Sequence, residues 1–200
     1  MLHSLTNSRA VADAILRVGQ MVSGPGFAGG LTWAQWTALR YLARANGLSR
    51  TPSAFAAFHG TTRGTASQTI KSLIAGGYVV RTRSKADGRS ARLDLTAKGW
   101  AAFAHDPAGD LVAAVEDLAP TLRHEAGAAL IRLIDSLALR RDTPRFGSCG
   151  DCRHRGDPAH GPDGTPRCEC RFTRVALDRD EMERLCIYFQ PARRAGRAVR

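Results

Sequence analysis

A change of periodicity in the middle of the chain constrains the fold more than any other feature. Two β-rich runs, YVVRTRS and SARLDLT, are joined by KADGR at residues 85–89. The Asp-Gly pair in this connection is a strong signal for a tight hairpin turn. Apolar residues recur at helical spacing on both sides of the hairpin, so the sequence predicts a two-stranded ribbon inserted into a helical chain.

Two helices are expected in the first quarter of the chain. Residues 8–23 carry apolar side chains at helical spacing, with Ser8 as a suitable cap. A second helix is expected from Thr32 to about residue 45. Its apolar stripe includes Trp33 and Trp36, which favours a place in the core for both rings rather than a role in stacking on bases.

Two further helices are predicted before the hairpin. The shorter one covers residues 52–58, with Pro52 at its first position and Gly60 just beyond its end. The next begins after Thr62, which is a suitable cap, and ends at the Gly-Gly pair 76–77. After the hairpin, helical patterns cover residues 97–104, 108–118 and 120–139.

Three helices followed by a hairpin is the element order of a winged helix-turn-helix. The predicted fold class is therefore mainly α with a small β-hairpin wing (α+β). In such a module the last helix before the hairpin enters the major groove of DNA, and the hairpin follows the backbone or the minor groove. Side chains early in that helix can reach base edges, and cations further along can meet phosphates. The candidate DNA-contacting residues are Arg63, Thr65, Ser67, Gln68 and Lys71 on the helix, and Arg83 and Lys85 on the hairpin.

Positive charge is concentrated around the predicted hairpin. The chain has a net charge of +11. Residues 31–99 hold 11 Lys and Arg but only 2 Asp and Glu, whereas residues 100–139 hold 2 and 6. A compositional bias toward Arg does not explain why acidic residues are so rare in one segment. The distribution indicates a polyanion as partner, with double-stranded DNA as the first candidate. The alternative is a basic ribbon that only protects a sheet edge against aggregation.

The segment DGRSARLDLTAKG, residues 87–99, resembles the wing of the MarR family of bacterial transcription regulators. The family's signature is an Asp-x-Arg turn that leads to a Leu-Thr pair and a Gly. The matching residues are Asp87, Arg89, Leu95, Thr96 and Gly99. The run LTWAQWTALRYLA looks like the family's second helix, and IKSLIAGGYVVR resembles the end of its recognition helix. The resemblance covers about residues 8–139.

This resemblance implies a homodimer that binds a pseudo-palindromic operator. The dimerisation helices would be the N-terminal helix and the last two helices of the core, which flank the winged helix-turn-helix. The resemblance also implies that Arg89 contacts the minor groove while Asp87 orients its guanidinium. A small-molecule effector, bound between the DNA module and the dimer helices, is a further expectation from the family.

All five cysteines lie in the tail of the chain, from residue 149 onward: Cys149, Cys152, Cys168, Cys170 and Cys186. No apolar run approaches the roughly 20 residues that span a bilayer, and the N-terminus lacks the pattern of a secretion signal. We therefore expect a cytoplasmic protein with no membrane partner. Thiols stay reduced in that compartment, so clustered cysteines are more readily metal ligands than disulfides.

Two kinds of metal centre fit the spacing of the cysteines. A structural zinc site would use the two short pairs, Cys149 with Cys152 and Cys168 with Cys170, and leave Cys186 spare. An iron–sulfur cluster, of the 4Fe-4S type, tolerates one pair with remote further ligands. That centre would use Cys149, Cys152, Cys170 and Cys186, with Cys168 as the alternative third ligand.

The two halves of the sequence suggest an organisation and a mechanism. We expect a DNA-binding and dimerisation domain at 1–139, a linker at 140–148 and a cysteine-rich metal-binding tail at 149–200. Loss or oxidation of the centre would shift the tail against helices 108–139 and so change operator affinity. In a second hypothesis, zinc only stabilises the tail of the same regulator. A small metal-dependent oxidoreductase is a distant third, because no catalytic motif is evident, and we expect no enzyme activity.

Overall fold

The computed structural model describes residues 7–23, 27–83, 91–160 and 166–192. Its first helix is α1 (Ser8–Ser23), and its cap differs from the one expected, because the Asn7 side chain accepts the Ala10 N–H at 2.8 Å. Ser8 is itself the first helical residue. A short ribbon follows, formed by β1 (Phe27–Ala28) and β2 (Leu31–Thr32).

Three helices then form the helix-turn-helix unit. Helix α2 (Trp33–Arg44) begins with a capping box in which Thr32 and Gln35 satisfy each other's backbone N–H groups. Helix α3 (Pro52–His59) starts at the expected proline and ends at Gly60, whose positive φ is permitted by the missing side chain. Helix α4 (Arg63–Ala75) is capped by Thr62, as predicted.

The wing is an antiparallel pair, β3 (Val79–Arg83) and β4 (Ala91–Leu95), in the register Val79 to Leu95 and Arg83 to Ala91. The turn between the strands lies outside the described residues. Helix α5 (Ala97–Phe103) follows, capped by Thr96. Gly99 packs so closely against the Tyr78 carbonyl that a Cβ atom would overlap the oxygen, which gives this residue of the wing signature a structural role.

The core of this unit lies where α2, α3, α4 and the base of the wing meet. Among its fully buried side chains are Leu39, Tyr41, Leu42, Phe55, Ile70, Leu73 and Leu93. Trp36 belongs to this core as predicted, whereas Trp33 is only half-buried and lies under the guanidinium of Arg40 at 4.4 Å. The mainly helical fold with a small antiparallel wing confirms the predicted fold class.

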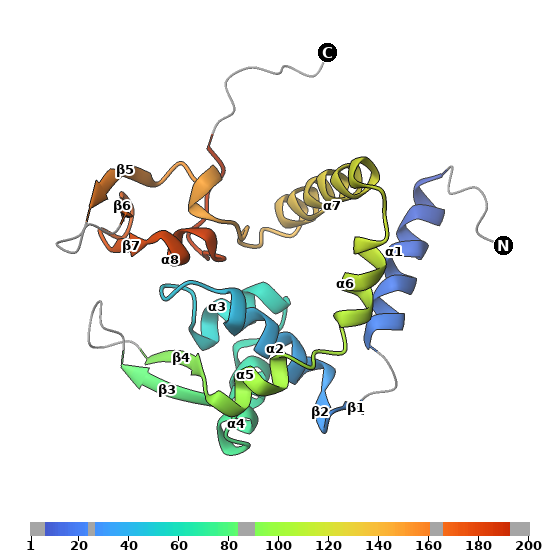
Figure 1. The fold of residues 1–200 in the computed structure, drawn as a ribbon, viewed down its shortest axis with the longest axis horizontal. Coiled ribbons are helices and arrows are strands. Elements are labelled where there is room, and N and C mark those ends of the chain that lie inside the picture. Colours follow the sequence, from blue (N-terminus) through green and yellow to red (C-terminus); the bar gives the residue numbers. More distant parts are fainter. Residues whose placement is uncertain (1–6, 24–26, 84–90, 161–165, 193–200) are drawn as a thin grey trace, which may run out of the picture.

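Helices α6 (Gly109–Glu116) and α7 (Pro120–Arg140) follow, and with α1 they lie to one side of the winged-helix unit (Figure 1). These helices bury little of their own surface. No residue of α1 or α6 within the described chain is buried, and α7 buries only Ala138. No described helix has the length and apolarity needed to cross a membrane.

The cysteine tail folds around a three-stranded antiparallel sheet of order β5-β6-β7, which the sequence did not suggest. Its elements are the 3-10 turn η1 (Cys149–Asp151), β5 (Arg155–His160), β6 (Pro166–Cys170), β7 (Ala176–Asp178) and α8 (Arg179–Glu183). Pro158 is tolerated because β5 is an edge strand. Gly156 lies in an irregular stretch of the β5–β6 pairing, where a Cβ atom would overlap the Glu169 carbonyl oxygen.

The tail packs against the loop between α2 and α3, on the other side of the unit from α1 (Figure 1). Leu185 N donates to Arg44 O and Asn46 N donates to Leu185 O, both at 2.9 Å. Phe146, from the expected linker, packs its ring edge-on against Phe58 and Tyr41 in the core. In this structure these hydrogen bonds hold the tail to the α2–α3 loop, whereas the expected shift of the tail against helices 108–139 stays a prediction.

Candidate functional site

Helix α4 presents a polar face that its apolar face orients. Ala66, Ile70 and Leu73 are fully buried against α2 and α3 and so fix the rotation of the helix. On the opposite face, four of the five residues expected to contact DNA are exposed. These are Arg63, Thr65, Gln68 and Lys71. The fifth, Ser67, is half-buried, which leaves it less able to reach a base edge.

The wing cations differ in how free they are. Arg81 is exposed, whereas Arg92 is tied down by a hydrogen bond from its Nε to Asp94 Oδ1 at 2.9 Å. Arg83 ends β3, but its side chain is not described. Lys85, Asp87 and Arg89 lie outside the described residues, so the expected minor-groove contact stays a prediction.

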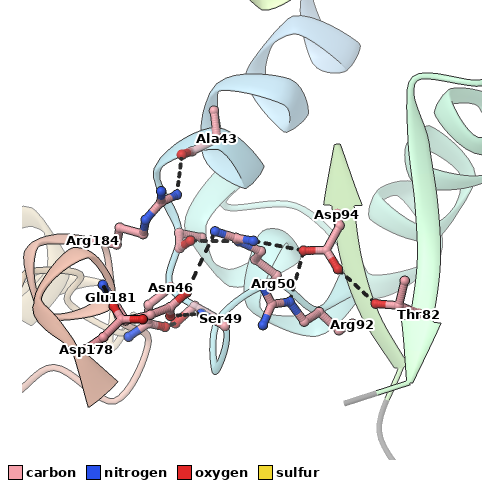
Figure 2. A network of polar contacts seen from close by, with 12 residues as sticks. Ala43, Asn46, Ser49, Arg50, Thr82, Arg92, Asp94, Asp178, Glu181 and Arg184 are labelled. Carbon is pink, nitrogen blue, oxygen red and sulfur yellow. Dashed lines mark hydrogen bonds and ion pairs between the residues drawn. The ribbon is translucent and has the colours of Figure 1, made fainter. Parts of the chain in front are cut away.

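Asp94 is the centre of a polar network at the base of the wing (Figure 2). Its Oδ1 accepts from Arg50 Nη1 at 2.8 Å as well as from Arg92, and its Oδ2 accepts from Thr82 Oγ1 at 2.8 Å. Burial alone would raise the pKa of Asp94, but the hydrogen bonds from Thr82, Arg50 and Arg92 outweigh it and leave the pKa below its usual value. Both strands of the wing are thereby linked to the α2–α3 loop.

The tail brings its thiols together from three segments. Cys149 and Cys152 bracket the turn η1, where Cys152 N donates to Cys149 O at 3.3 Å. Cys170 ends β6, and Cys186 pairs with Gly147 in an isolated antiparallel bridge. Cys149, Cys168, Cys170 and Cys186 are buried and Cys152 is half-buried; none of these five described residues forms a disulfide.

The thiols are close enough to influence one another. Burial raises the pKa of Cys149 to about 12, and the neighbouring Cys186, Cys152, Cys168 and Cys170 add to the effect. A thiol in such a place is held neutral unless a cation compensates the charge of its thiolate. Cys149 and Cys170 also share an apolar cluster with Leu177, against which Leu48, Val175 and Met182 pack.

Cys168 and Cys170 point into different surroundings. The Cys168 sulfur lies 3.4 Å from Gly156 O, to which it donates a hydrogen bond, so the backbone of β5 engages it. Cys170 belongs to the cluster with Cys149. Both thiols are nevertheless near enough to Cys149 to influence its pKa, so the choice between Cys170 and Cys168 as a ligand stays a prediction.

Cys186 has polar neighbours that belong to the DNA-binding unit. Burial raises its pKa, while hydrogen-bonding groups of Asn46, Tyr188 and Ser49 favour its thiolate and lower the shift. Asn46 and Ser49 come from the α2–α3 loop, and both are completely buried. The sequence analysis did not identify these two residues, and a short polar run in a loop gives no signal of a thiol 137 positions away from Ser49.

The described side chains do not form a ready-made site for a single ion. No three His, Cys, Asp or Glu side chains of the described residues are grouped closely enough to hold a metal. His154 packs its ring against Phe172, with centroids 5.1 Å apart, and its Nε2 is buried without a partner in the described structure. His160 is exposed on β5.

Comparisons with known proteins agree with the winged-helix architecture. The model of the MarR family matches residues 29–90. A search of curated proteins gave no match. The S. aureus MepR–DNA complex has a TM-score of 0.52 and 19% identity, and the match covers 66% of this chain and 96% of that chain. A MarR/EmrR family regulator from Acinetobacter sp. ADP1 has a TM-score of 0.52 and 16% identity, with 66% and 95% covered.

The transcriptional regulator SlyA is similar to the same extent, with a TM-score of 0.52, 18% identity and coverage of 68% of this chain and 96% of its own. Similarity at this level of identity establishes the fold. Over about two-thirds of its length the chain has the winged helix-turn-helix fold of MarR-type regulators, and residues 29–90 match the model of that family.

Proposed function

We propose that this protein is a dimeric DNA-binding transcriptional regulator whose tail carries a cysteine-ligated iron–sulfur cluster. The observation that carries the DNA-binding part is the exposed polar face of α4 beside a basic wing. Gln68 and Lys71 lie three residues apart and are both exposed, so they share one face of the helix. That face matches what a recognition helix needs in order to reach base edges and phosphates.

The exposed apolar faces of three helices support a homodimer. A single chain leaves large side chains of α1, α6 and α7 open to solvent, among them Val11, Ile15, Val18, Leu111, Val115, Leu130, Leu133 and Leu137. Large apolar side chains exposed in such number on three helices are typical of an interface with another chain. A second copy, packed on these helices, would place two α4 helices on successive half-sites of DNA. A small-molecule effector stays a prediction of the family resemblance.

The convergence of the thiols supports the metal centre. Cys152, Cys168, Cys170 and Cys186 all lie near enough to Cys149 to influence its thiol, and Cys149 and Cys170 belong to an apolar cluster that limits the access of water. Burial of several thiols without a cation would leave them unreactive, whereas a metal converts them to thiolates and stabilises a small tail. A four-iron cluster is larger than one zinc ion, so it suits thiols that are near each other without forming a single-ion site.

The metal is tested by anaerobic purification, followed by assays for iron, acid-labile sulfide and zinc. We expect iron and sulfide in similar amounts and visible absorption that disappears on oxidation. Cys170→Ser should lose most of the metal. Cys168→Ser is the matched control two residues away and should retain it. Zinc without sulfide would refute the cluster in favour of the structural zinc site, and absence of both metals would refute any metal centre.

The DNA-binding part is tested with duplexes selected from a random library by the purified protein. Gln68→Ala should relax the preference for one base pair, costing about 1–3 kcal/mol on the preferred site. Lys71→Ala should instead weaken binding to all duplexes and reduce the salt dependence by about one ion. Arg179→Gln, which removes a cation from α8, is the control for charge. If selection enriches no sequence, sequence-specific DNA binding is refuted.

A further inference from the structure

The α2–α3 loop forms hydrogen bonds with the residues on both sides of Cys186. Asn46 N donates to Leu185 O at 2.9 Å, and Ile187 N donates to Ser49 Oγ at 2.9 Å. Ala45 and Leu185 also form a parallel bridge. Cys186 therefore lies between two residues whose backbones are bonded to the DNA-binding unit, so a displacement of its sulfur is transmitted to that loop.

The side-chain amide of Asn46 has a buried N–H donor for which a thiolate would be a suitable acceptor. Its Oδ1 accepts from Ser49 Oγ at 2.7 Å, but its Nδ2 is buried with no hydrogen-bond partner in the described structure. The residue is completely buried, so bulk solvent does not reach this group. Because the Asn46 backbone N–H is bonded to Leu185 O, the residue lies close to Cys186, whose sulfur becomes a strong acceptor when a metal deprotonates it. An N–H group that donates to a ligating sulfur orients that ligand and changes the reduction potential of the metal centre.

The same loop is bonded to the tail and the wing by a second set of contacts (Figure 2). Arg50 donates to Ala45 O at 2.9 Å and to Asp94 at 2.8 Å, and it lies 4.0 Å from Glu181 of the tail. Glu181 also accepts the backbone N–H of Gly47. Arg50 thus stands between a carboxylate of the tail and a carboxylate of the wing.

We propose that the loop 46–50 is both a part of the metal centre and its connection to the wing, in which Asn46 donates an N–H···S hydrogen bond to Cys186 and Arg50 transmits the position of the tail to Asp94. This inference rests on the proposed metal centre. Loss of the metal releases Cys186 from the other thiols and weakens the hydrogen bonds at Leu185 and Ile187. The Arg50 pair with Asp94 then changes, and with it the angle of the wing on DNA.

This route replaces the one expected from the sequence, which ran through helices 108–139. The contacts that define it are local to one half-site, because each chain has its own loop, tail and wing. The metal would therefore alter the contact of each wing with DNA without having to change the spacing of the two recognition helices. Coupling of the two sites requires that the wing take one arrangement with the tail in place and another without it, and the Arg50 contacts with Asp94 and Glu181 are where the two would differ.

The role of Asn46 is tested on the full-length protein, purified anaerobically, with Asn46→Ala and Asn46→Asp. Both remove the N–H donor, and the aspartate keeps the shape and the acceptor for Ser49. We expect each variant to release its metal to a chelator about tenfold faster than wild type, as is typical when a supporting hydrogen bond is removed. If the centre is a cluster, its reduction potential should also fall in both. Release rates equal to wild type in both variants would overturn this role.

The connection to the wing is tested by the ratio of DNA affinities with the metal bound and removed, measured on a duplex selected by wild-type protein. We expect wild type to change affinity by roughly fivefold or more. Arg50→Gln and Glu181→Gln should bring the ratio close to one while retaining their metal. Arg179→Gln is the control, because Arg179 lies on the same helix as Glu181 but pairs with Glu183, and it should keep the wild-type ratio. Glu181→Gln changes the tail side of the same connection, so the test does not depend on the folding of Arg50→Gln at the base of the wing.

The outcomes separate this inference from the proposed function. Wild-type protein that purifies without metal would overturn the centre, and the connection with it. Metal-loaded wild type whose DNA affinity ignores metal removal would overturn the connection alone. The same holds if Arg50→Gln and Glu181→Gln both respond as wild type does. A ratio that collapses in these variants with metal content unchanged supports the connection.

Discussion

Replacing Asp94 by asparagine removes a charge on which three donors converge. Arg50, Arg92 and Thr82 all donate to its carboxylate, at 2.8, 2.9 and 2.8 Å. The asparagine side chain has the same shape, but only one of its two terminal atoms accepts hydrogen bonds. In the Asp94→Asn variant, the amide oxygen can still face the two arginines while Nδ2 donates to Thr82 Oγ1, so the variant loses the negative charge that strengthens the hydrogen bonds from Arg50 and Arg92. Arg50 is 9% exposed and would keep its charge with only the distant Glu181 carboxylate to compensate it.

The size of the effect follows from burial. Hydrogen bonds to charged groups contribute about 1.5–3 kcal/mol each in stability. The Asp94 side chain is 26% exposed, so water replaces part of what is lost. We therefore expect the free energy of unfolding to fall by about 2 kcal/mol. For a chain of this length, that corresponds to a decrease in Tm of about 4–8 °C.

The pH dependence gives the prediction a sign. The pKa of Asp94 is lowered in the folded protein from an ordinary value of 3.8, so the folded state favours the charged form. The stability that this charge provides is complete above the ordinary value and is lost as the pH falls through the lowered one. The difference between wild type and Asp94→Asn should therefore be constant from pH 7 to pH 5 and shrink below about pH 4.

Urea unfolding of wild type and variant, at one protein concentration and equal metal content, measures the difference. Asp157→Asn is the matched control, because the same change is made at a side chain that is 92% exposed. The control should lie within about 0.5 kcal/mol of wild type. An Asp94→Asn variant as stable as this control, or a difference that grows at acid pH, would refute the reasoning about the wing base.

The other predictions concern close packing in the two halves of the chain. Gly99→Ala should destabilise the protein by about 3 kcal/mol in urea unfolding, because the new Cβ would overlap the Tyr78 carbonyl, whereas Gly109→Ala, with open space around it, should change stability by less than about 1 kcal/mol. Gly156→Ala should disrupt the pairing of β5 with β6 and accelerate proteolysis of the tail, while Gly150→Ala should not. Equal behaviour within either pair would contradict the corresponding close approach.

The sequence predicted the helices and the wing because each carries its own local signals. Thr62 and Thr96 accept the N–H groups that a capping residue should accept, and Gly60 takes the positive φ of a helix end. Local signals also misassigned one cap, since Asn7 rather than Ser8 supports α1, and neighbouring polar residues compete for such a position on nearly equal terms. The sheet of the tail escaped prediction because β5 contains both Gly156 and Pro158, which weaken a strand pattern, and its edge position is what makes the strand feasible.

The position of the tail on the winged-helix unit could not be predicted, because it depends on contacts between residues more than a hundred positions apart. Arg184 donates to Ala43 O at 3.0 Å, and Ile187 N donates to Ser49 Oγ at 2.9 Å. The sequence around these residues has no distinctive pattern that would indicate either contact. Backbone atoms provide many of these partners, and any residue type would offer them. Sequence patterns report periodicity and local chemistry, whereas the meeting of two loops is decided by the whole fold.

This arrangement explains why buried polar residues occur at a place where a DNA-binding module alone would need none. Asn46, Ser49 and Arg50 are buried at the end of α2, and burying polar groups is costly unless each finds a partner. Much of what they bond to is supplied by the tail, through Leu185, Ile187 and Glu181. Removal of the tail would therefore leave the loop exposed and Arg50 held mainly by Asp94 and Ala45 O. The winged-helix unit and the cysteine tail are thus structurally interdependent, and a change in the thiols has a short physical path to the wing.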